Sequence, residues 1–154
     1  MQSQALRRRM RMIAVAGITA VLSVALTDTV ATARTVTMTE VAQLHLVRRS
    51  GSVLYERGTV SGTLDGTVSA RFETSTTSVS GRVTIYPHGG GSLTINVAGN
   101  LESLSGVNAT FTGSIAVRRG TGRYARATGS GTFTGIVNRR TWAAKVTARG
   151  RLTY

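Results

Sequence analysis

The sequence predicts an all-β fold, an eight-stranded antiparallel barrel, and three observations carry this prediction. Apolar and polar residues alternate with a period of two along most of residues 34–154, which is typical of strands with one buried and one solvated face. Turn signals separate the alternating runs at short, fairly even intervals. Glycine recurs on the apolar faces, and repeated inward glycine suits the curvature of a closed barrel better than a sandwich.

The alternating runs give the predicted strands in chain order. Leu93, Ile95 and Val97, interleaved with Ser, Thr and Asn, form one run with an apolar face and a polar face. Asp65-Gly66 predicts a tight hairpin turn, because both central residues of a type I′ turn need a positive φ. The predicted strands are 41–48, 52–64, 67–75, 78–86, 92–98, 108–118, 128–138 and 141–154.

Loops and inward-facing glycines complete the pattern. Clusters of Gly, Asn, Ser and Arg predict the remaining breaks at 87–91, 99–100, 105–108, 119–122 and 138–140. Glycine weakens a strand interior unless the strand bends or lets another backbone approach. Because a missing side chain also leaves volume, we expect these thin walls to leave space for an interior cavity. The inward-facing glycines are Gly58, Gly62, Gly81, Gly113, Gly129, Gly131 and Gly135.

Composition excludes several classes of protein. The chain has 154 residues, no Cys and a net charge of +13, and Lys145 is its single Lys. Without Cys there is no disulfide framework, zinc-thiolate site, iron–sulfur cluster or thiol nucleophile. No apolar run reaches the roughly 18 residues that a helix needs to span a bilayer. The length predicts one domain.

Residues 1–33 have the pattern of a secretory signal peptide. Residues 7–11 carry four Arg, residues 12–26 form an apolar stretch, and the Ala-Thr-Ala at 31–33 matches an A-x-A cleavage site. Cleavage after Ala33 would remove four Arg and one Asp and leave residues 34–154 as a domain with a net charge of +10. We therefore expect a secreted, extracellular protein without a transmembrane span, and an uncleaved membrane anchor is the alternative.

One segment carries a resemblance to a known superfamily. Residues 120–127 form the pattern Gly-x-Gly-x-Tyr-x-x-Ala, which follows a predicted strand around Gly113-Ser114-Ile115 and leads into a glycine-rich strand through Phe133. This arrangement resembles the allene oxide cyclase and dirigent barrels. The resemblance implies an eight-stranded antiparallel barrel whose interior binds a small, mostly apolar molecule and steers its cyclisation or coupling. The matched segment is a structural stretch, so it transfers no site residue to this chain.

The first functional hypothesis is non-catalytic binding of a small apolar ligand in the barrel interior. Val83, Phe111, Phe133 and Trp142 fall on the apolar faces of their strands, so we expect them to line that interior. No cofactor is predicted. No metal site is predicted either, because the two histidines have no partner ligands at a suitable spacing.

The second hypothesis is a cyclase or isomerase that acts on a small apolar substrate, with Glu56 as its general acid. Leu54 and Gly58 at i±2 place Glu56 on the apolar face of its strand. A carboxylate there is desolvated and its pKa is raised, as a general acid requires. The alternative is a register break near the start of the strand, which leaves Glu56 in water beside Arg57.

The third hypothesis is a basic, envelope-associated interaction or structural protein that binds an anionic polymer. Arginine binds phosphate and carboxylate groups with two parallel hydrogen bonds. Sequence-specific nucleic-acid binding is not expected, because the chain has no recognition helix and its apolar-face aromatics cannot stack on bases. The alternative is a basic surface that serves solubility alone. The candidate polyanion-binding residues are Arg48, Arg49, Arg118, Arg119, Arg139 and Arg140.

Overall fold

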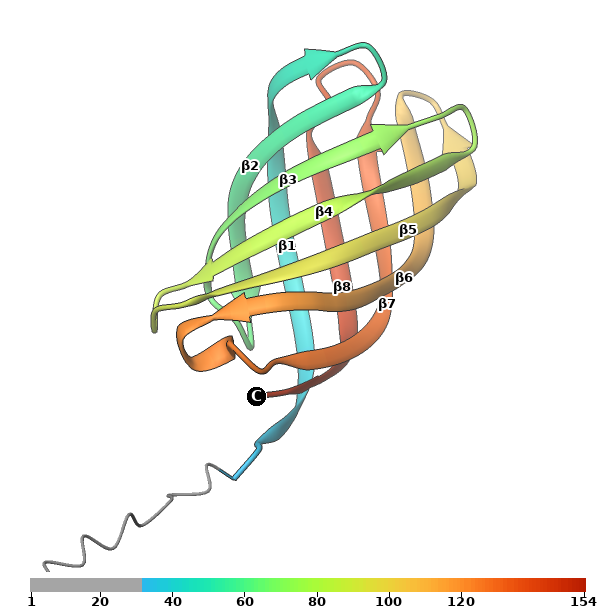
Figure 1. Cartoon of the computed structure of the whole chain (residues 1–154). Coiled ribbons are helices and arrows are strands. Elements are labelled where there is room, and N and C mark those ends of the chain that lie inside the picture. The colour runs from blue at the N-terminus through green and yellow to red at the C-terminus, as the bar shows by residue number, and fades with distance from the viewer. Residues whose placement is uncertain (1–31) are drawn as a thin grey trace, which may run out of the picture. The chain divides into compact units, whose positions relative to one another are not determined.

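The computed structural model describes residues 32–154, which form a closed, eight-stranded antiparallel barrel (Figure 1). Each strand pairs with the next along the chain, and the first pairs with the last to close the sheet. The predicted fold class is therefore confirmed. The predicted signal peptide lies outside the described residues except for its last two. The strands are β1 (Thr35–Ser50), β2 (Val53–Gly62), β3 (Gly66–Thr74), β4 (Ser78–Pro87), β5 (Ser92–Ser105), β6 (Asn108–Thr121), β7 (Thr128–Asn138) and β8 (Ala144–Thr153).

Three strands extend at least two residues beyond their predicted ends, and one of them, β6, continues to Thr121 through the break predicted at residues 119–122. β1 begins at Thr35 rather than at residue 41, and Met38 and Glu40 in this additional part of the strand are buried. The inward-facing Glu40 interrupts the apolar pattern, which concealed this part of the strand. β5 continues to Ser105, through the break that was predicted at residues 99–100.

Gly99 lies within β5 because an aromatic ring occupies the space beside it. Gly99 pairs with Gly113 of β6, which pairs with Phe133 of β7. A Cβ atom on Gly99 would lie 2.6 Å from Cζ of Phe133. The glycine therefore makes room for a ring from two strands away and does not end the strand.

Trp142 lies in the turn between β7 and β8, not in the last strand as predicted. Its φ of 59° is in the left-handed region, which costs an ordinary L-residue roughly 1–2 kcal/mol. The Trp142 N–H donates a hydrogen bond of 2.7 Å to the Asn138 carbonyl. The Asn138 side-chain oxygen accepts hydrogen bonds from the backbone N–H groups of Arg140 and Thr141. These bonds hold the turn and place the tryptophan.

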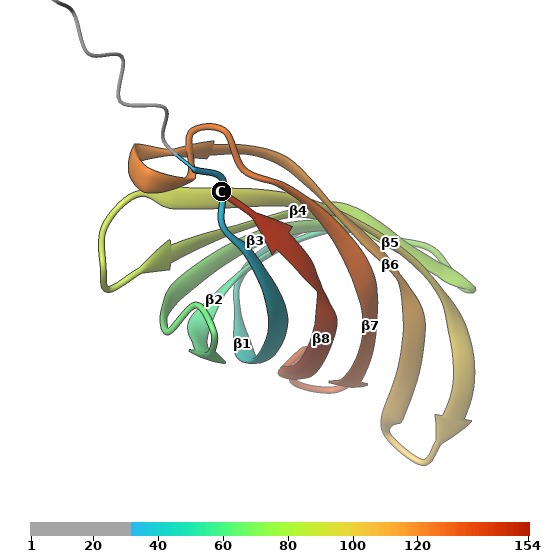
Figure 2. The same cartoon turned by 90° about the horizontal axis from the view of Figure 1, so that it is seen from below.

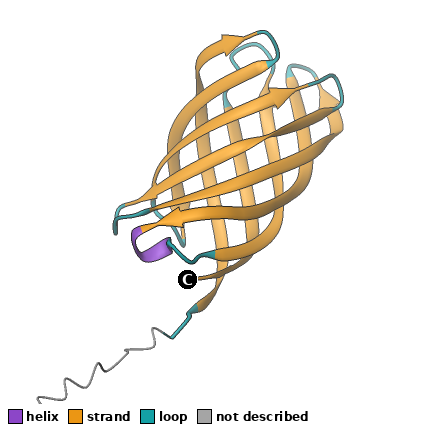
Figure 3. Ribbon diagram, viewed as in Figure 1, coloured by secondary structure: helices purple, strands orange, loops and turns teal. Residues whose placement is uncertain are grey.

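The two ends of the barrel differ, as Figures 1 and 2 show. The closed end carries the turns after β2, β4 and β6 and the short 3-10 helix η1 (Gly122–Tyr124), which is the one helix in Figure 3. Tyr124 is buried and packs against Tyr154, with 4.9 Å between ring centroids. The Gly-x-Gly-x-Tyr-x-x-Ala pattern therefore builds this end of the barrel. Its fully buried side chains are Leu64, Leu93 and Leu152.

A β-bulge near the other end of β1 decides which of two adjacent arginines faces the barrel interior. The register with β2 shifts between Leu46 and Arg48, so Val47 is the extra residue. Beyond the bulge, Arg48 pairs with Tyr55 on the outer face, and its guanidinium lies 4.3 Å from the Tyr55 ring centroid. Arg49 therefore falls on the opposite face, toward the barrel interior.

Candidate functional site

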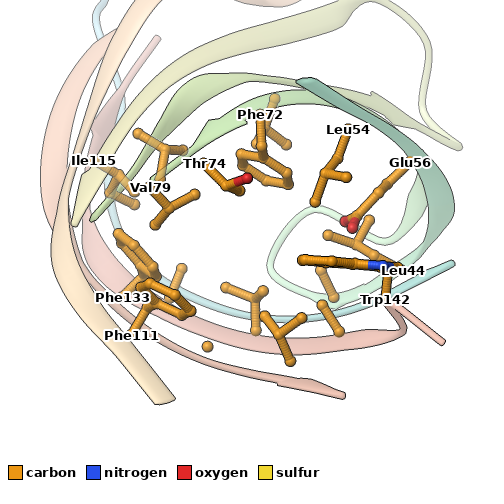
Figure 4. A pocket seen from close by; sticks show the side chains of 18 of the residues that line it. Leu44, Leu54, Glu56, Phe72, Thr74, Val79, Phe111, Ile115, Phe133 and Trp142 are labelled. Atoms are coloured by element: carbon orange, nitrogen blue, oxygen red, sulfur yellow. The ribbon is translucent and has the colours of Figure 1, made fainter. Parts of the chain in front are cut away.

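The barrel contains an apolar cavity of about 360 Å³ (Figure 4). Exposed residues from the end of β5 and from the turns after β3 and β7 line its mouth, so the cavity opens at the end opposite η1, which we call the open end. The volume lies within the range of small-molecule binding sites. The exposed residues at the mouth are Ser75, Thr76, Leu104 and Arg139.

The four residues predicted to line the interior all line this cavity. Val83 comes from β4, Phe111 from β6 and Phe133 from β7, whereas Trp142 reaches the cavity from the β7–β8 turn. In Figure 4, Phe111 and Phe133 lie across the cavity from Glu56. Their contact with a ligand stays a prediction.

Glu56 of β2 points its carboxyl group into the cavity (Figure 4). Its side chain is 3% exposed, and its Oε2 has no hydrogen-bond partner among the described residues. Burial raises the pKa of Glu56 to about 7. The register along β2 is unbroken from Leu54 to Gly58, so the alternative arrangement in water beside Arg57 does not occur.

Glu40 of β1 is a second buried carboxyl, which was not predicted from the sequence. It is 3% exposed and also lines the cavity. Its Oε1 accepts a hydrogen bond of 2.9 Å from the Leu64 N–H, whereas its Oε2 has no partner. Burial raises the pKa of Glu40 to about 7, although the Leu64 bond opposes the shift. Met38 and Ala42 at i±2 were the signal that would have identified it.

The two buried carboxyls are too far apart to share a proton. Glu56 pairs with Leu46, which is six residues along β1 from Glu40. At roughly 3.3 Å per residue, the two Cα positions are about 20 Å apart along the strand. A proton-sharing carboxyl pair has its groups about 3 Å apart. Glu40 and Glu56 are therefore independent polar groups, with Glu40 nearer the closed end.

Arginine side chains hold the mouth of the cavity together. The Arg49 guanidinium lies 4.8 Å from the Trp142 ring centroid, and its Nε donates a hydrogen bond of 3.0 Å to the Gly51 carbonyl. Arg139 donates a hydrogen bond to the Gly106 carbonyl and so links the turns after β5 and β7. The tryptophan at the mouth is thus covered by a cation on one face.

The six arginines predicted to bind polyanions are divided between two places. Four of them lie at the open end, at the close of β1 and in the turn after β7: Arg48, Arg49, Arg139 and Arg140. Arg118 and Arg119 lie near the end of β6 that leads into η1. The structure therefore does not gather the six into one surface.

The described residues offer the cavity a limited polar chemistry. Within residues 32–154, no group of three or more His, Asp or Glu side chains is arranged to hold a metal ion. Across the same stretch, no helix is long and apolar enough to cross a membrane. The polar side chains that line the cavity are the two buried carboxyls, hydroxyls at the mouth, Arg139 and the indole of Trp142.

No protein-family model, curated protein or solved structure matches the chain. The function is therefore inferred from the cavity and from the groups that line it.

Proposed function

We propose that this protein binds one small, mostly apolar molecule inside the barrel, and that it does so outside the cytoplasm. The observation that carries the proposal is the apolar cavity of about 360 Å³ with an unpaired, buried carboxyl on its wall. Apolar walls favour binding because contact removes apolar surface from water. The signal-peptide pattern of residues 1–33 supports secretion.

Glu56 indicates which kind of molecule fits. A buried carboxyl oxygen without a partner is costly, and a hydrogen-bonding group on a ligand would remove that cost. With a pKa of about 7, the carboxyl of Glu56 can donate or accept a hydrogen bond near neutral pH. The expected ligand has an apolar body and one polar group, such as a hydroxyl.

The resemblance of residues 120–133 to allene oxide cyclase and dirigent barrels supports the same function. In that superfamily the barrel interior holds a small, mostly apolar molecule. We propose that this chain belongs to the superfamily, on that segment together with its closed eight-stranded barrel.

Fluorescence titration with 2-naphthol tests for binding. The emission of 2-naphthol overlaps that of Trp142, the single Trp of the chain, so the probe is excited beyond the absorption of tryptophan and its own emission reports on occupancy. We expect saturable, one-to-one binding whose Kd changes by less than about twofold between about 50 and 500 mM NaCl, since a buried apolar contact is not screened by salt. Absence of saturation would contradict the proposal.

Filling the cavity provides a matched pair of variants. Gly135 lines the cavity, and a Cβ atom there would meet the nearest atom, Cγ2 of Val146, at an ordinary 3.4 Å. Gly135→Leu should therefore fold and weaken 2-naphthol binding at least about tenfold, because the added side chain occupies the site. Thr134→Leu adds a leucine one residue away on the exposed face and serves as the control. Equal binding by the two variants would place the ligand elsewhere.

A second pair of probes tests the role of Glu56. Naphthalene lacks only the hydroxyl of 2-naphthol, so the ratio of the two Kd values measures the polar contact. We expect the wild type to prefer 2-naphthol by up to about tenfold, the size of one net hydrogen bond. Glu56→Leu should abolish the preference and keep naphthalene binding. A preference that survives in Glu56→Leu would remove Glu56 from the binding site.

The raised pKa of Glu56 favours one alternative function, a cyclase or isomerase. An acid whose pKa lies near the working pH can both give and take a proton within one reaction cycle. For any substrate found by screening apolar compounds, Glu56→Gln distinguishes the two functions. Loss of turnover with unchanged binding would identify an enzyme, and unchanged turnover would exclude Glu56 as its acid.

A further inference from the structure

Four arginines line a groove on the outer face of the barrel, on the other side of the sheet from the cavity. The groove has a volume of about 590 Å³ and runs across β1–β5. Its arginines are all exposed, and Glu73 is the one exposed carboxylate among its lining residues. Positive charge is therefore in excess. The arginines are Arg48, Arg57, Arg71 and Arg82.

Two of these arginines face each other directly across the sheet. Arg71 of β3 pairs with Arg82 of β4. Side chains in such directly opposite positions have their Cβ atoms about 4.5–5.5 Å apart, and like charges there are destabilising. The row continues to Tyr55 on one side and to Asn96 on the other, and Glu73, two residues from Arg71 in the next row, is the one exposed carboxylate beside the pair.

The hydroxyl group of Tyr55 lies in the positive potential of this row, and its pKa responds to it. Arg48 stacks 4.3 Å from its ring centroid, and Arg71 lies beside it on β3. Hydrogen bonding from Arg71 lowers the pKa of the Tyr55 hydroxyl, and Arg48 acts in the same direction. The neighbouring row of the groove adds two hydroxyl groups, because Ser69 and Thr84 pair directly with each other.

We propose that this groove binds a tetrahedral oxyanion, a phosphate or sulfate group, between Arg71 and Arg82. Guanidinium groups hold such oxyanions with paired, charge-assisted hydrogen bonds. The strands fix the backbone positions of the two arginines side by side before any anion binds, so only their side chains need to be ordered. A bound oxyanion would also relieve the repulsion between the two cations. Ser69 lies where a hydroxyl donor would complete the site, whereas the Thr84 hydroxyl already shares a hydrogen bond of 3.2 Å with the Thr94 hydroxyl.

Titration with inorganic phosphate and with inorganic sulfate at constant ionic strength tests the proposal. Binding is monitored through the NMR chemical shifts of the arginine Nε–H groups. We expect saturable shifts at Arg71 and Arg82 that fit one site. Arg71→Gln with Arg82→Gln should weaken binding at least about tenfold, because both guanidinium groups and their paired hydrogen bonds to the anion are lost. The matched control is Arg149→Gln with Arg151→Gln, which removes the same charge from exposed positions of β8 whose partners carry no charge. It should weaken binding less than about threefold.

Three outcomes would overturn the proposal. The first is equal weakening by the two double variants, which would assign binding to the net charge of the surface. The second is shifts spread over all exposed arginines, and the third is no saturation by either anion. Polyphosphate and heparin, tested in the same way, distinguish a phosphate from a sulfate source, and the tighter of the two must depend on Arg71 and Arg82.

Discussion

Two glutamates lie on the inner face of a barrel whose other inward side chains are almost all apolar. Glu40 and Glu56 are each 3% exposed, and each has one carboxyl oxygen without a partner. Because desolvation penalises the charged form, the pKa of each is raised to about 7 from an ordinary value of 4.5. At the scale of single residues, the barrel therefore holds protons that the unfolded chain would release.

This difference in pKa makes the stability of the barrel fall as the pH rises. The folded state keeps the Glu56 proton up to about pH 7, whereas the unfolded chain loses it near pH 4.5. The stabilisation is therefore complete below about pH 4.5 and is lost between about pH 4.5 and 7. At 1.36 kcal/mol per pKa unit, the loss is about 3 kcal/mol for Glu56.

Glu56→Gln should remove that loss, because glutamine stays neutral. We expect the variant to gain about 3 kcal/mol of unfolding free energy over the wild type at about pH 8, and almost nothing at about pH 4. Urea unfolding at the two pH values measures the difference. Glu73→Gln, which makes the same substitution at an exposed position, is the matched control. A wild type that is equally stable at both values would contradict the raised pKa.

At the scale of strands, the alternation of apolar and polar residues predicted most of the barrel. It failed to predict strand where a residue's role depends on a residue far away in the sequence. All eight strands were found because their outward residues are Thr, Ser and Arg and their inward residues are apolar or Gly. Glu40 concealed the start of β1, since a buried carboxyl looks polar in sequence. Gly99 looked like a break because the ring beside it comes from Phe133, 34 residues later. Such contacts depend on register, which local patterns do not encode.

Substitution by alanine should change the stability differently at a crowded inward glycine, Gly99, and at an uncrowded one, Gly135. Gly99→Ala would place its Cβ 2.6 Å from Phe133 and 2.7 Å from the Thr112 carbonyl, so we expect a destabilisation of about 1–3 kcal/mol. At Gly135 the nearest atom is 3.4 Å away, so Gly135→Ala should be neutral or slightly stabilising. Thermal unfolding of both variants compares them. A Gly99→Ala variant as stable as Gly135→Ala would contradict the packing of Phe133.

The bulge in β1 makes a separate prediction about adjacent residues. Arg49 stacks on Trp142 at the cavity mouth, whereas Arg48 stacks on Tyr55 on the outer face. Arg49→Ala should therefore expose one face of the tryptophan, shift its emission to the red and increase quenching by acrylamide. Arg48→Ala should leave both properties unchanged. Identical spectra for the two variants would contradict the placement of Arg49, rather than Arg48, against Trp142.

At the scale of the whole barrel, the two ends perform different tasks. The closed end is packed with leucines and sealed by Tyr124, whereas the open end leaves the cavity accessible between turns. The sequence predicted inward aromatics and a possible cavity but not which end would open. That choice depends on side chains from many strands meeting at one level, and local alternation carries no information about it.

The predicted secretion is tested on the intact chain. Expression of residues 1–154 in a secreting host should deliver to the medium a protein that begins at Arg34, since Ala31-Thr32-Ala33 matches the cleavage pattern. Intact-mass measurement and N-terminal sequencing check this result. An unprocessed protein retained in the cell membrane would favour the anchor alternative.

The seam between β1 and β8 has a consequence for how the barrel assembles. Arg34 and Tyr154 exchange two backbone hydrogen bonds, of 2.8 and 3.0 Å, so positions far apart in sequence are adjacent in space. Every other strand pairing is a local hairpin, and the loop closed by this seam is by far the longest, so its entropic cost is greatest. The seam should therefore form last during folding. Joining residues 154 and 34 and opening the chain at Gly51 would give a circular permutant in which the last pairing is instead between β1 and β2.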